Sequence, residues 1–201
     1  MEYITSSDFH FKDTAVALGK FEGIHRGHQL LMDEVKKQEL HGLRSVVFTF
    51  DRPTRLTLTG DTEYKQIYTK KERREILEKR GIDILIEHPF TKEFAALTPD
   101  RFIREVLVEK VGAKVIVVGT DFHFGKNRSG SITDLEKLEE ECGYHLIVVE
   151  KLQLNGKDIS STRIRASLEK GAMEEAKATL IDEVVVTGTG VQKKIAVTGA
   201  V

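Results

Sequence analysis

The sequence predicts a doubly wound α/β fold built on a parallel sheet of about five strands. Five short runs of apolar, β-branched residues recur along the first 150 residues, and segments with helical spacing separate them. The runs are continuous rather than alternating, which is typical of strands buried on both faces of a parallel sheet. Regular alternation of strands and helices favours right-handed crossovers, with helices covering both faces of the sheet.

The five predicted strands are four to six residues long. They occupy residues 14–18, 45–50, 82–86, 114–118 and 145–149.

Helices are predicted between and after these strands. They cover residues 27–40, 70–80, 99–110, 132–142, 160–170 and 174–180. Gly81, Gly143 and Gly171 end three of them, because glycine tolerates the left-handed conformation of a helix C-terminus. The charge run 70–74 is expected to be a solvated helix face.

The end of the chain departs from this alternation. Asn155 and Gly156 predict a tight turn. Two β-branched runs in residues 184–201 predict a short β-rich tail. We therefore expect a domain over 1–183 followed by this tail over 184–201.

Composition excludes several classes of protein. The length of 201 residues suits one larger domain. The 31 Lys and Arg against 32 Asp and Glu argue against a protein that coats nucleic acid. A single cysteine, Cys142, excludes a disulfide framework and a Cys-rich zinc site. No apolar run approaches the ~20 residues of a membrane span, and the N-terminus lacks the features of a secretory signal. We expect a soluble cytoplasmic protein without a membrane or nucleic-acid partner.

The loop after the first strand carries a pair of histidines. Gly19 and Gly27 allow close approach of the backbone to a ligand, and Phe21 lies between them. His25 and His28 stand three apart at the start of a helix, on one face, where the helix dipole favours phosphate. Two imidazole donors there suit an oxyanion better than a metal; the alternative is an ordinary surface pair.

The loop after the fourth strand is rich in glycine and aromatic residues. Its candidate binding residues are Gly119, Asp121, Phe122, Phe124, Gly125 and Arg128. Such a loop could hold a flat ring. The alternative is a turn whose two phenylalanines fold into the core.

The helix start near residue 160 combines hydroxyl and guanidinium donors. They are Ser160, Ser161, Thr162, Arg163 and Arg165. Together with the free backbone N–H groups they form a candidate phosphate grip. Ile164 and Leu168 define the buried face, so Arg163 and Arg165 flank it from opposite sides and only one is expected to face the phosphates. The alternative is a capped helix with solvated arginines.

These segments carry a family resemblance. Residues 21–28 resemble the His-x-Gly-His signature of the nucleotidyltransferase superfamily. Residues 118–126 and 159–165 are similar to the paired signatures of prokaryotic FAD synthetase, the FMN adenylyltransferase module of riboflavin kinase/FAD synthetases. The resemblance covers about residues 15–180. It implies a Rossmann-like nucleotidyltransferase fold and the conversion of ATP and FMN into FAD and pyrophosphate with Mg²⁺.

The resemblance also implies roles for individual residues. His25, His28 and Arg165 match catalytic positions that bind the ATP phosphates and stabilise the transition state. Gly19, Phe21, Gly27, Ser160, Ser161, Thr162 and Arg163 match positions around the phosphates. The loop at 119–128 matches the flavin and nucleotide loop, and Mg²⁺ is expected to be held mainly by phosphates.

The chain departs from the family pattern at three places. Glu22 stands where Asp is usual. Residues 51–53 read Asp-Arg-Pro instead of Pro-His-Pro, so any role of that histidine is absent or moved to Arg52 or Arg55. The Pro-Thr-Ala-Asn signature of the kinase domain is missing, so we expect an adenylyltransferase without riboflavin kinase activity.

Two other functions stay open on the sequence alone. The chain could be another small nucleotidyltransferase that acts on a different phosphate ester. It could also be a flavin- or nucleotide-binding module without turnover.

Overall fold

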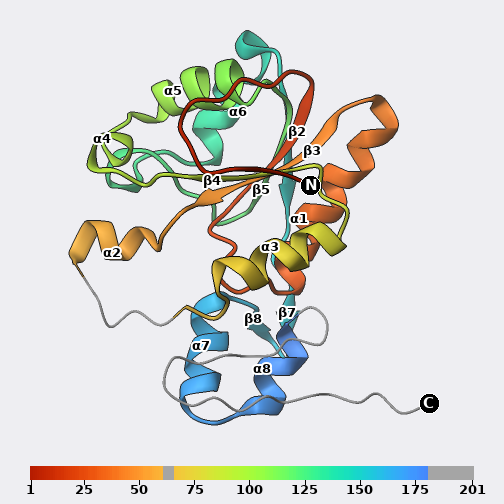
Figure 1. The fold of residues 1–201 in the computed structure, drawn as a ribbon, viewed down its shortest axis with the longest axis vertical. Coiled ribbons are helices and arrows are strands. Elements are labelled where there is room, and N and C mark those ends of the chain that lie inside the picture. The colour runs from red at the N-terminus through yellow and green to blue at the C-terminus, as the bar shows by residue number, and fades with distance from the viewer. Residues whose placement is uncertain (61–65, 181–201) are drawn as a thin grey trace.

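A computed structural model describes residues 1–60 and 66–180 and contains a six-stranded parallel sheet (Figure 1). The strands, in chain order, are β1 (Glu2–Ile4), β2 (Thr14–Leu18), β3 (Arg44–Phe50), β4 (Ile84–His88), β5 (Ala113–Gly119) and β6 (His145–Val149). Their order across the sheet is β1-β4-β3-β2-β5-β6, and every neighbouring pair is parallel. The predicted α/β fold is confirmed.

The direction of winding reverses at β2. From β2 the chain builds outward through β3 and β4 on one side, and β5 then returns to pair with β2 on the other. In open α/β sheets a crevice forms at such a reversal, outside the carboxyl ends of the strands. The loops that leave β2 and β5 therefore meet at the place where this fold binds ligands.

Helices cover both faces of the sheet. The helical elements are α1 (Arg26–Lys37), η1 (Gln38–His41), α2 (Thr54–Thr59), α3 (Lys70–Lys79), α4 (Lys92–Ala95), α5 (Pro99–Arg101), η2 (Phe102–Lys110), η3 (Lys126–Arg128), α6 (Ile132–Cys142), α7 (Ser161–Glu169) and α8 (Met173–Thr179). Val16 and Leu18 of β2 face a core that η2 and α6 cover, whereas Ala15 and Ala17 face a core shared with α1, α3, α7 and α8. Figure 1 shows α5 and α6 together on one side of the sheet, and α7 and α8 beyond its far end.

The sixth strand is the main addition to the prediction. β1 is three residues long and pairs only with β4 at the edge of the sheet, so its sequence pattern is too short to show periodicity. The strand predicted over 82–86 begins two residues later, because the Ile82 N–H bonds the Leu77 carbonyl and closes the end of α3.

Two predicted helices differ in form. The helix predicted over 27–40 is α-helical to Lys37 and then tightens into the 3₁₀ turn η1, which ends at the left-handed Gly42. The helix predicted over 99–110 continues from α5 into the π-helix η2.

The predicted turn at Asn155 and Gly156 connects the two strands of a short hairpin, β7 (Gln153–Leu154) and β8 (Lys157–Asp158). The predicted tail, 184–201, and the domain boundary before it lie outside the described residues.

Candidate active site

The two histidines of the first loop stack on each other at the start of α1. Their ring centroids are 3.9 Å apart, and His25 is the residue that caps the helix. The His28 N–H donates to Nδ1 of His25 at 3.3 Å, and Nδ1 of His28 donates to the Gly23 carbonyl at 3.1 Å. Each ring thus has its Nδ1 held by the protein, and no hydrogen bond within the described part of the chain engages either Nε2.

This hydrogen bonding determines where the protons lie. Nδ1 of His25 accepts a hydrogen bond, so the neutral ring carries its proton on Nε2 and can donate it. Nδ1 of His28 already carries a proton, so its Nε2 becomes a donor only when the ring is protonated. Burial lowers the pKa of His25 to about 4, against a smaller opposing effect of the Asp121 charge. Burial and the neighbouring His25 ring lower the pKa of His28 well below its usual value. Both rings are therefore neutral at pH 7.

The rest of this loop is built to hold the pair. Phe21 is fully buried at a φ of 45°, and its ring lies 4.7 Å from that of His28. A Cβ on Gly27 would come within 3.1 Å of Nδ1 of His25, so a side chain there would press on the imidazole. A Cβ on Gly19 would come within 3.0 Å of the Phe21 ring. The glycines thus make room for the aromatic rings that position the histidines.

The start of α7 lies against this loop. Ser160 caps α7 by accepting the N–H of Arg163 at 3.3 Å. A Cβ on Gly23 would lie 3.4 Å from Oγ of Ser161, and Thr162 is exposed at the same helix end. The predicted phosphate grip therefore adjoins the histidine loop.

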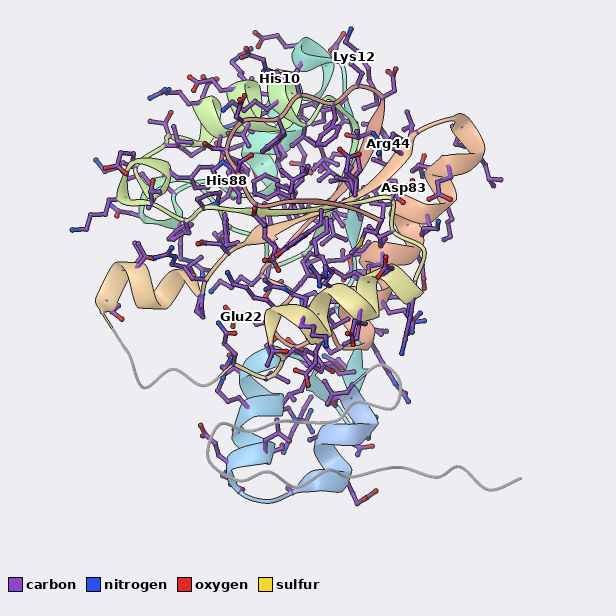
Figure 2. The ribbon with its side chains drawn as sticks, viewed as in Figure 1. His10, Lys12, Glu22, Arg44, Asp83 and His88 are labelled. Atoms are coloured by element: carbon purple, nitrogen blue, oxygen red, sulfur yellow. The ribbon has the colours of Figure 1, made fainter. Side chains whose placement is uncertain are left out.

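The two arginines of α7 point to different partners. Nη2 of Arg165 donates to Oε2 of Glu22 at 3.2 Å, which ties α7 to the histidine loop. Figure 2 shows Glu22 between the sheet and α7. Arg163 instead donates to the carbonyls of Leu154 and Lys157 in the β7–β8 hairpin. Ile164 between them is buried, as the helix geometry requires.

The loop after β5 is divided between core and surface. Phe124 is 7 % exposed and packs on Phe102 and Phe122, so its ring supports the loop from inside. Gly125, at a φ of 70°, lies so close to Pro99 that a Cβ would come within 3.0 Å of the proline nitrogen. Arg128 is exposed. The structure thus favours the core alternative for Phe124.

Gly119 and Asp121 lie close together in this loop, since a Cβ on Gly119 would be 3.5 Å from Oδ1 of Asp121. Asp121 is exposed, and its charge acts on His25. Lys151, two residues after the end of β6, places Nζ 3.1 Å from Oδ2 of Asp121 and 3.3 Å from Oδ2 of Asp158. This ion-pair network links the loop after β5 to the β7–β8 hairpin.

A pocket opens on the β3 side of the histidine loop. It is lined by Lys20, Glu22, Phe50, Asp51, Arg52, Pro53, Thr54, Gln66, Tyr68 and Arg73. Glu22 lines this pocket and also contacts Arg165, so the pocket adjoins the phosphate grip on α7. Arg52, considered above as a replacement for the missing histidine, pairs with Asp51 at 2.8 Å; the side chain of Arg55 lies outside the description.

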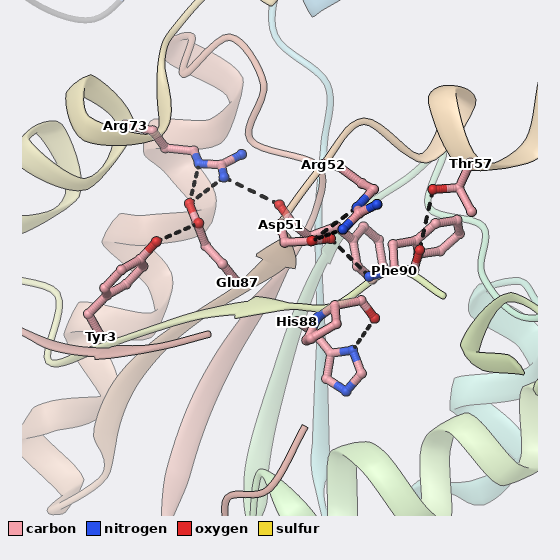
Figure 3. A network of polar contacts seen from close by, with 10 residues as sticks. Tyr3, Asp51, Arg52, Thr57, Arg73, Glu87, His88 and Phe90 are labelled. Carbon is pink, nitrogen blue, oxygen red and sulfur yellow. Dashed lines mark hydrogen bonds and ion pairs between the residues drawn. The ribbon is translucent and has the colours of Figure 1, made fainter. Parts of the chain in front are cut away.

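Asp51 fixes the loop that forms this pocket. Its carboxylate accepts the N–H of Phe90 at 2.9 Å, and its own N–H donates to the His88 carbonyl (Figure 3). Burial opposes ionisation of Asp51, but the hydrogen bonds from Arg52 and Phe90 outweigh it and lower the pKa of the carboxyl.

Sequence reasoning missed two contributors to the site. The charge run 70–74 was expected to be solvated, and this is wrong for Arg73, which is 9 % exposed and pairs with the buried Glu87. The Glu87 of β4 lies inside an apolar strand, and a charge in such a run is the signal that could have indicated a buried partner. Leu180 was also missed: its backbone forms a bridge with that of His25 and brings the end of α8 to the histidines.

Comparison with known proteins assigns the chain to a family. The family model described as FAD synthetase matches residues 8–163, which include the histidine pair, the loop after β5 and the start of α7. The chain belongs to the FAD synthetase family.

Relatives in several bacteria agree with this assignment. A putative bifunctional riboflavin kinase/FMN adenylyltransferase of Geobacillus thermodenitrificans is 32 % identical over 83 % of this chain and 89 % of its own length. The bifunctional riboflavin kinase/FMN adenylyltransferase of Listeria monocytogenes is 31 % identical over 88 % of this chain and 56 % of its own length. The Escherichia coli K12 protein of that name is 30 % identical over 82 % of this chain and 53 % of its own length. The chain spans about half the length of the latter two relatives.

Solved structures support the fold. A Streptococcus pneumoniae structure described as a macrolide-efflux protein superposes with a TM-score of 0.78 and 28 % identity, over 88 % of this chain and 70 % of that one. A pantoate-β-alanine ligase of Francisella tularensis, at 15 % identity and a TM-score of 0.54, shares the fold alone. Among the described residues of the present chain, no helix has the length and apolar character needed to cross a membrane.

Proposed function

We propose that this chain is an FMN adenylyltransferase that converts ATP and FMN into FAD and pyrophosphate. The observation that carries the proposal is the meeting of the histidine pair with the start of α7, through Glu22 and Arg165, at the reversal point of the sheet. Membership of the FAD synthetase family supports the choice of FMN as acceptor.

The reaction is a single displacement at phosphorus. An oxygen of the FMN phosphate attacks the α-phosphorus of ATP and forms the new P–O bond. The bond from the α-phosphorus to the oxygen bridging to the β-phosphate breaks, and pyrophosphate leaves with that electron pair. The FMN phosphate is already ionised near neutral pH, so no general base is needed. Catalysis then depends on positioning and charge stabilisation.

The site residues fit these two tasks. Nε2 of His25 donates to the phosphates in its neutral form, while His28 gains its second donor by protonation as negative charge approaches. Arg165, Ser161 and Thr162 would hold the β- and γ-phosphates at the N-terminus of α7, where backbone N–H groups add donors. The pocket beside Glu22 adjoins this helix start through the Glu22–Arg165 contact and would receive the acceptor.

Magnesium fits this site only as an ion held by phosphate. The described residues contain no group of three or more His, Cys, Asp or Glu side chains able to cage a metal. The two nearby carboxylates, Glu22 and Asp121, are paired with Arg165 and Lys151. Mg²⁺ commonly takes phosphate oxygens and waters, with few protein ligands. When bound, it would neutralise phosphate charge alongside Arg165.

A panel of acceptors and nucleotides tests the proposal. The purified chain is incubated with Mg²⁺ and either ATP or CTP, and with FMN, pantetheine phosphate or glycerol phosphate. We expect pyrophosphate release and a new nucleotide product only with ATP and FMN. Turnover with a different pair would indicate another nucleotidyltransferase, and FAD binding without any pyrophosphate release would indicate a binding module. We expect the activity in the cytoplasmic fraction of cells and, given the net charge of −1, no nucleic-acid partner.

A further inference from the structure

A buried ion pair lies beside the proposed acceptor pocket. Arg73 of α3 is 9 % exposed and Glu87 of β4 is fully buried. Nε of Arg73 donates to Oε1 of Glu87 at 3.0 Å, and Nη2 contacts the same oxygen. The Tyr3 hydroxyl donates to the other carboxylate oxygen at 2.7 Å (Figure 3). Both oxygens of Glu87 are therefore engaged, and the guanidinium is held from one side.

Stability alone is a weak reason for this arrangement. Removing two charges from water is costly, and well-packed apolar residues often replace a buried ion pair without loss of stability. The geometry around Arg73 indicates a second task. Its Nη2 also reaches the carbonyl of Phe50, the last residue of β3, at 3.3 Å. Arg73 and Phe50 both line the pocket.

The end of β3 determines the shape of that pocket. Thr49 donates to the Lys20 carbonyl at 2.7 Å and so joins β3 to the histidine loop. Phe50 follows it, and Asp51 begins the loop that is bonded to Phe90. A shift of the Phe50 carbonyl would move this wall, whereas His25 and Arg165 are absent from the pocket lining.

We propose that Arg73 is a positioning residue for the acceptor substrate, held by Glu87 so that it fixes the end of β3. The inference rests on the proposed function, because it takes the pocket as the acceptor site. The planar guanidinium makes the Glu87 and Phe50 contacts at one fixed angle. The ammonium of lysine is a single point charge and cannot reproduce both in the same geometry.

Arg73→Lys is the variant that tests this, with Tyr3→Phe as its matched control. Arg73→Lys keeps a cation beside Glu87 but loses the planar fork, whereas Tyr3→Phe weakens the same network at the end away from the pocket. For both, FMN binding is followed by flavin fluorescence without ATP, kcat and KM are measured for each substrate, and thermal melts report folding. We expect Arg73→Lys to raise the Kd and KM for FMN about five- to tenfold, with kcat and the KM for ATP within about twofold. Tyr3→Phe should lower the melting temperature and leave FMN binding unchanged.

Other outcomes would overturn the inference. Unchanged FMN binding in folded Arg73→Lys would show that the pair is only structural, and so would an equal loss in Tyr3→Phe. If Arg73→Lys does not fold, Glu87→Gln, which keeps the shape of the partner, must show the same selective effect on FMN or the inference fails. A wild-type chain that binds FMN but makes no FAD would contradict the proposed function and leave the binding comparison intact.

Discussion

Arg163 and Arg165 lie two residues apart on α7 and offer a direct contrast between an arginine bonded to the β7–β8 hairpin and one that we propose to be catalytic. Arg165→Ala removes the guanidinium that contacts Glu22 beside the histidine pair. Loss of one preorganised donor to developing charge typically costs about 10²–10³ in rate, or about 3–4 kcal/mol. Arg163→Ala removes bonds of 3.3 and 3.4 Å to carbonyls of the β7–β8 hairpin, each worth about 0.5–1.5 kcal/mol of folding free energy.

The two variants should therefore separate in different assays. Pyrophosphate release gives kcat and KM for ATP and FMN, and thermal melts give the loss of stability. We expect Arg165→Ala to lose kcat by about 10²-fold or more and to melt near the wild type, and Arg163→Ala to keep kcat within about threefold and to melt earlier. Arg165→Lys should recover part of the rate. If Arg165→Ala keeps its turnover, or if Arg163→Ala loses as much, the phosphate grip on α7 is assigned to the wrong residue.

Four further predictions concern the two loops. Burial lowers the pKa of His25 from 6.5 to about 4, so the unfolded chain binds this proton at a higher pH than the folded chain. The free energy of unfolding should therefore fall as the pH drops from 6.5 toward 4. Denaturant titrations should show a smaller fall for His25→Asn than for the wild type. Binding of a triphosphate should raise the pKa of both histidines, so calorimetry in buffers of different ionisation enthalpy should detect proton uptake with ATP at pH 7, reduced in His28→Asn; equal uptake in the variant would exclude His28 as the proton acceptor. Gly27→Ala would bring a Cβ within 3.1 Å of Nδ1 of His25, so kcat should fall about tenfold with little change in the melting temperature, and a fully active variant would show that the ring position is not critical. Asp121→Ala removes an exposed carboxylate paired with Lys151 and should act mainly on the KM for FMN or ATP; a loss confined to kcat would contradict a binding role.

The fold was predictable because the strands of this sheet are buried on both faces. Continuous apolar runs located five of the six strands, and glycines located three of the helix ends. β1 could not be found in this way, because three residues at an edge show no period and depend on pairing with β4. The π-helical form of η2 could not be found either, because its apolar stripe over Phe102 to Leu107 is the one an α-helix would show.

The candidate site was predictable where local spacing determines geometry. The three-residue spacing of His25 and His28 at a helix start predicted that they share one face, where the structure stacks their rings, and the Ile164 stripe separated Arg163 from Arg165. Long-range contacts could not be read in the same way. Arg73 looked solvated within a charged helix, and only the topology brings Glu87 of β4 beneath it, 14 residues away in the sequence.

The fate of isotopic label from ATP tests the proposed reaction most directly. The chain is incubated with FMN and ATP labelled at the α-phosphorus, and in parallel with ATP labelled at the γ-phosphorus. The account predicts that the α-label appears in FAD and that the γ-label appears in pyrophosphate. In His28→Ala, neither product should be detected over the time in which the wild type forms both. Label that stays in ATP in the presence of FMN, or that moves only to a different phosphate ester, would contradict the assignment of this chain as an FMN adenylyltransferase.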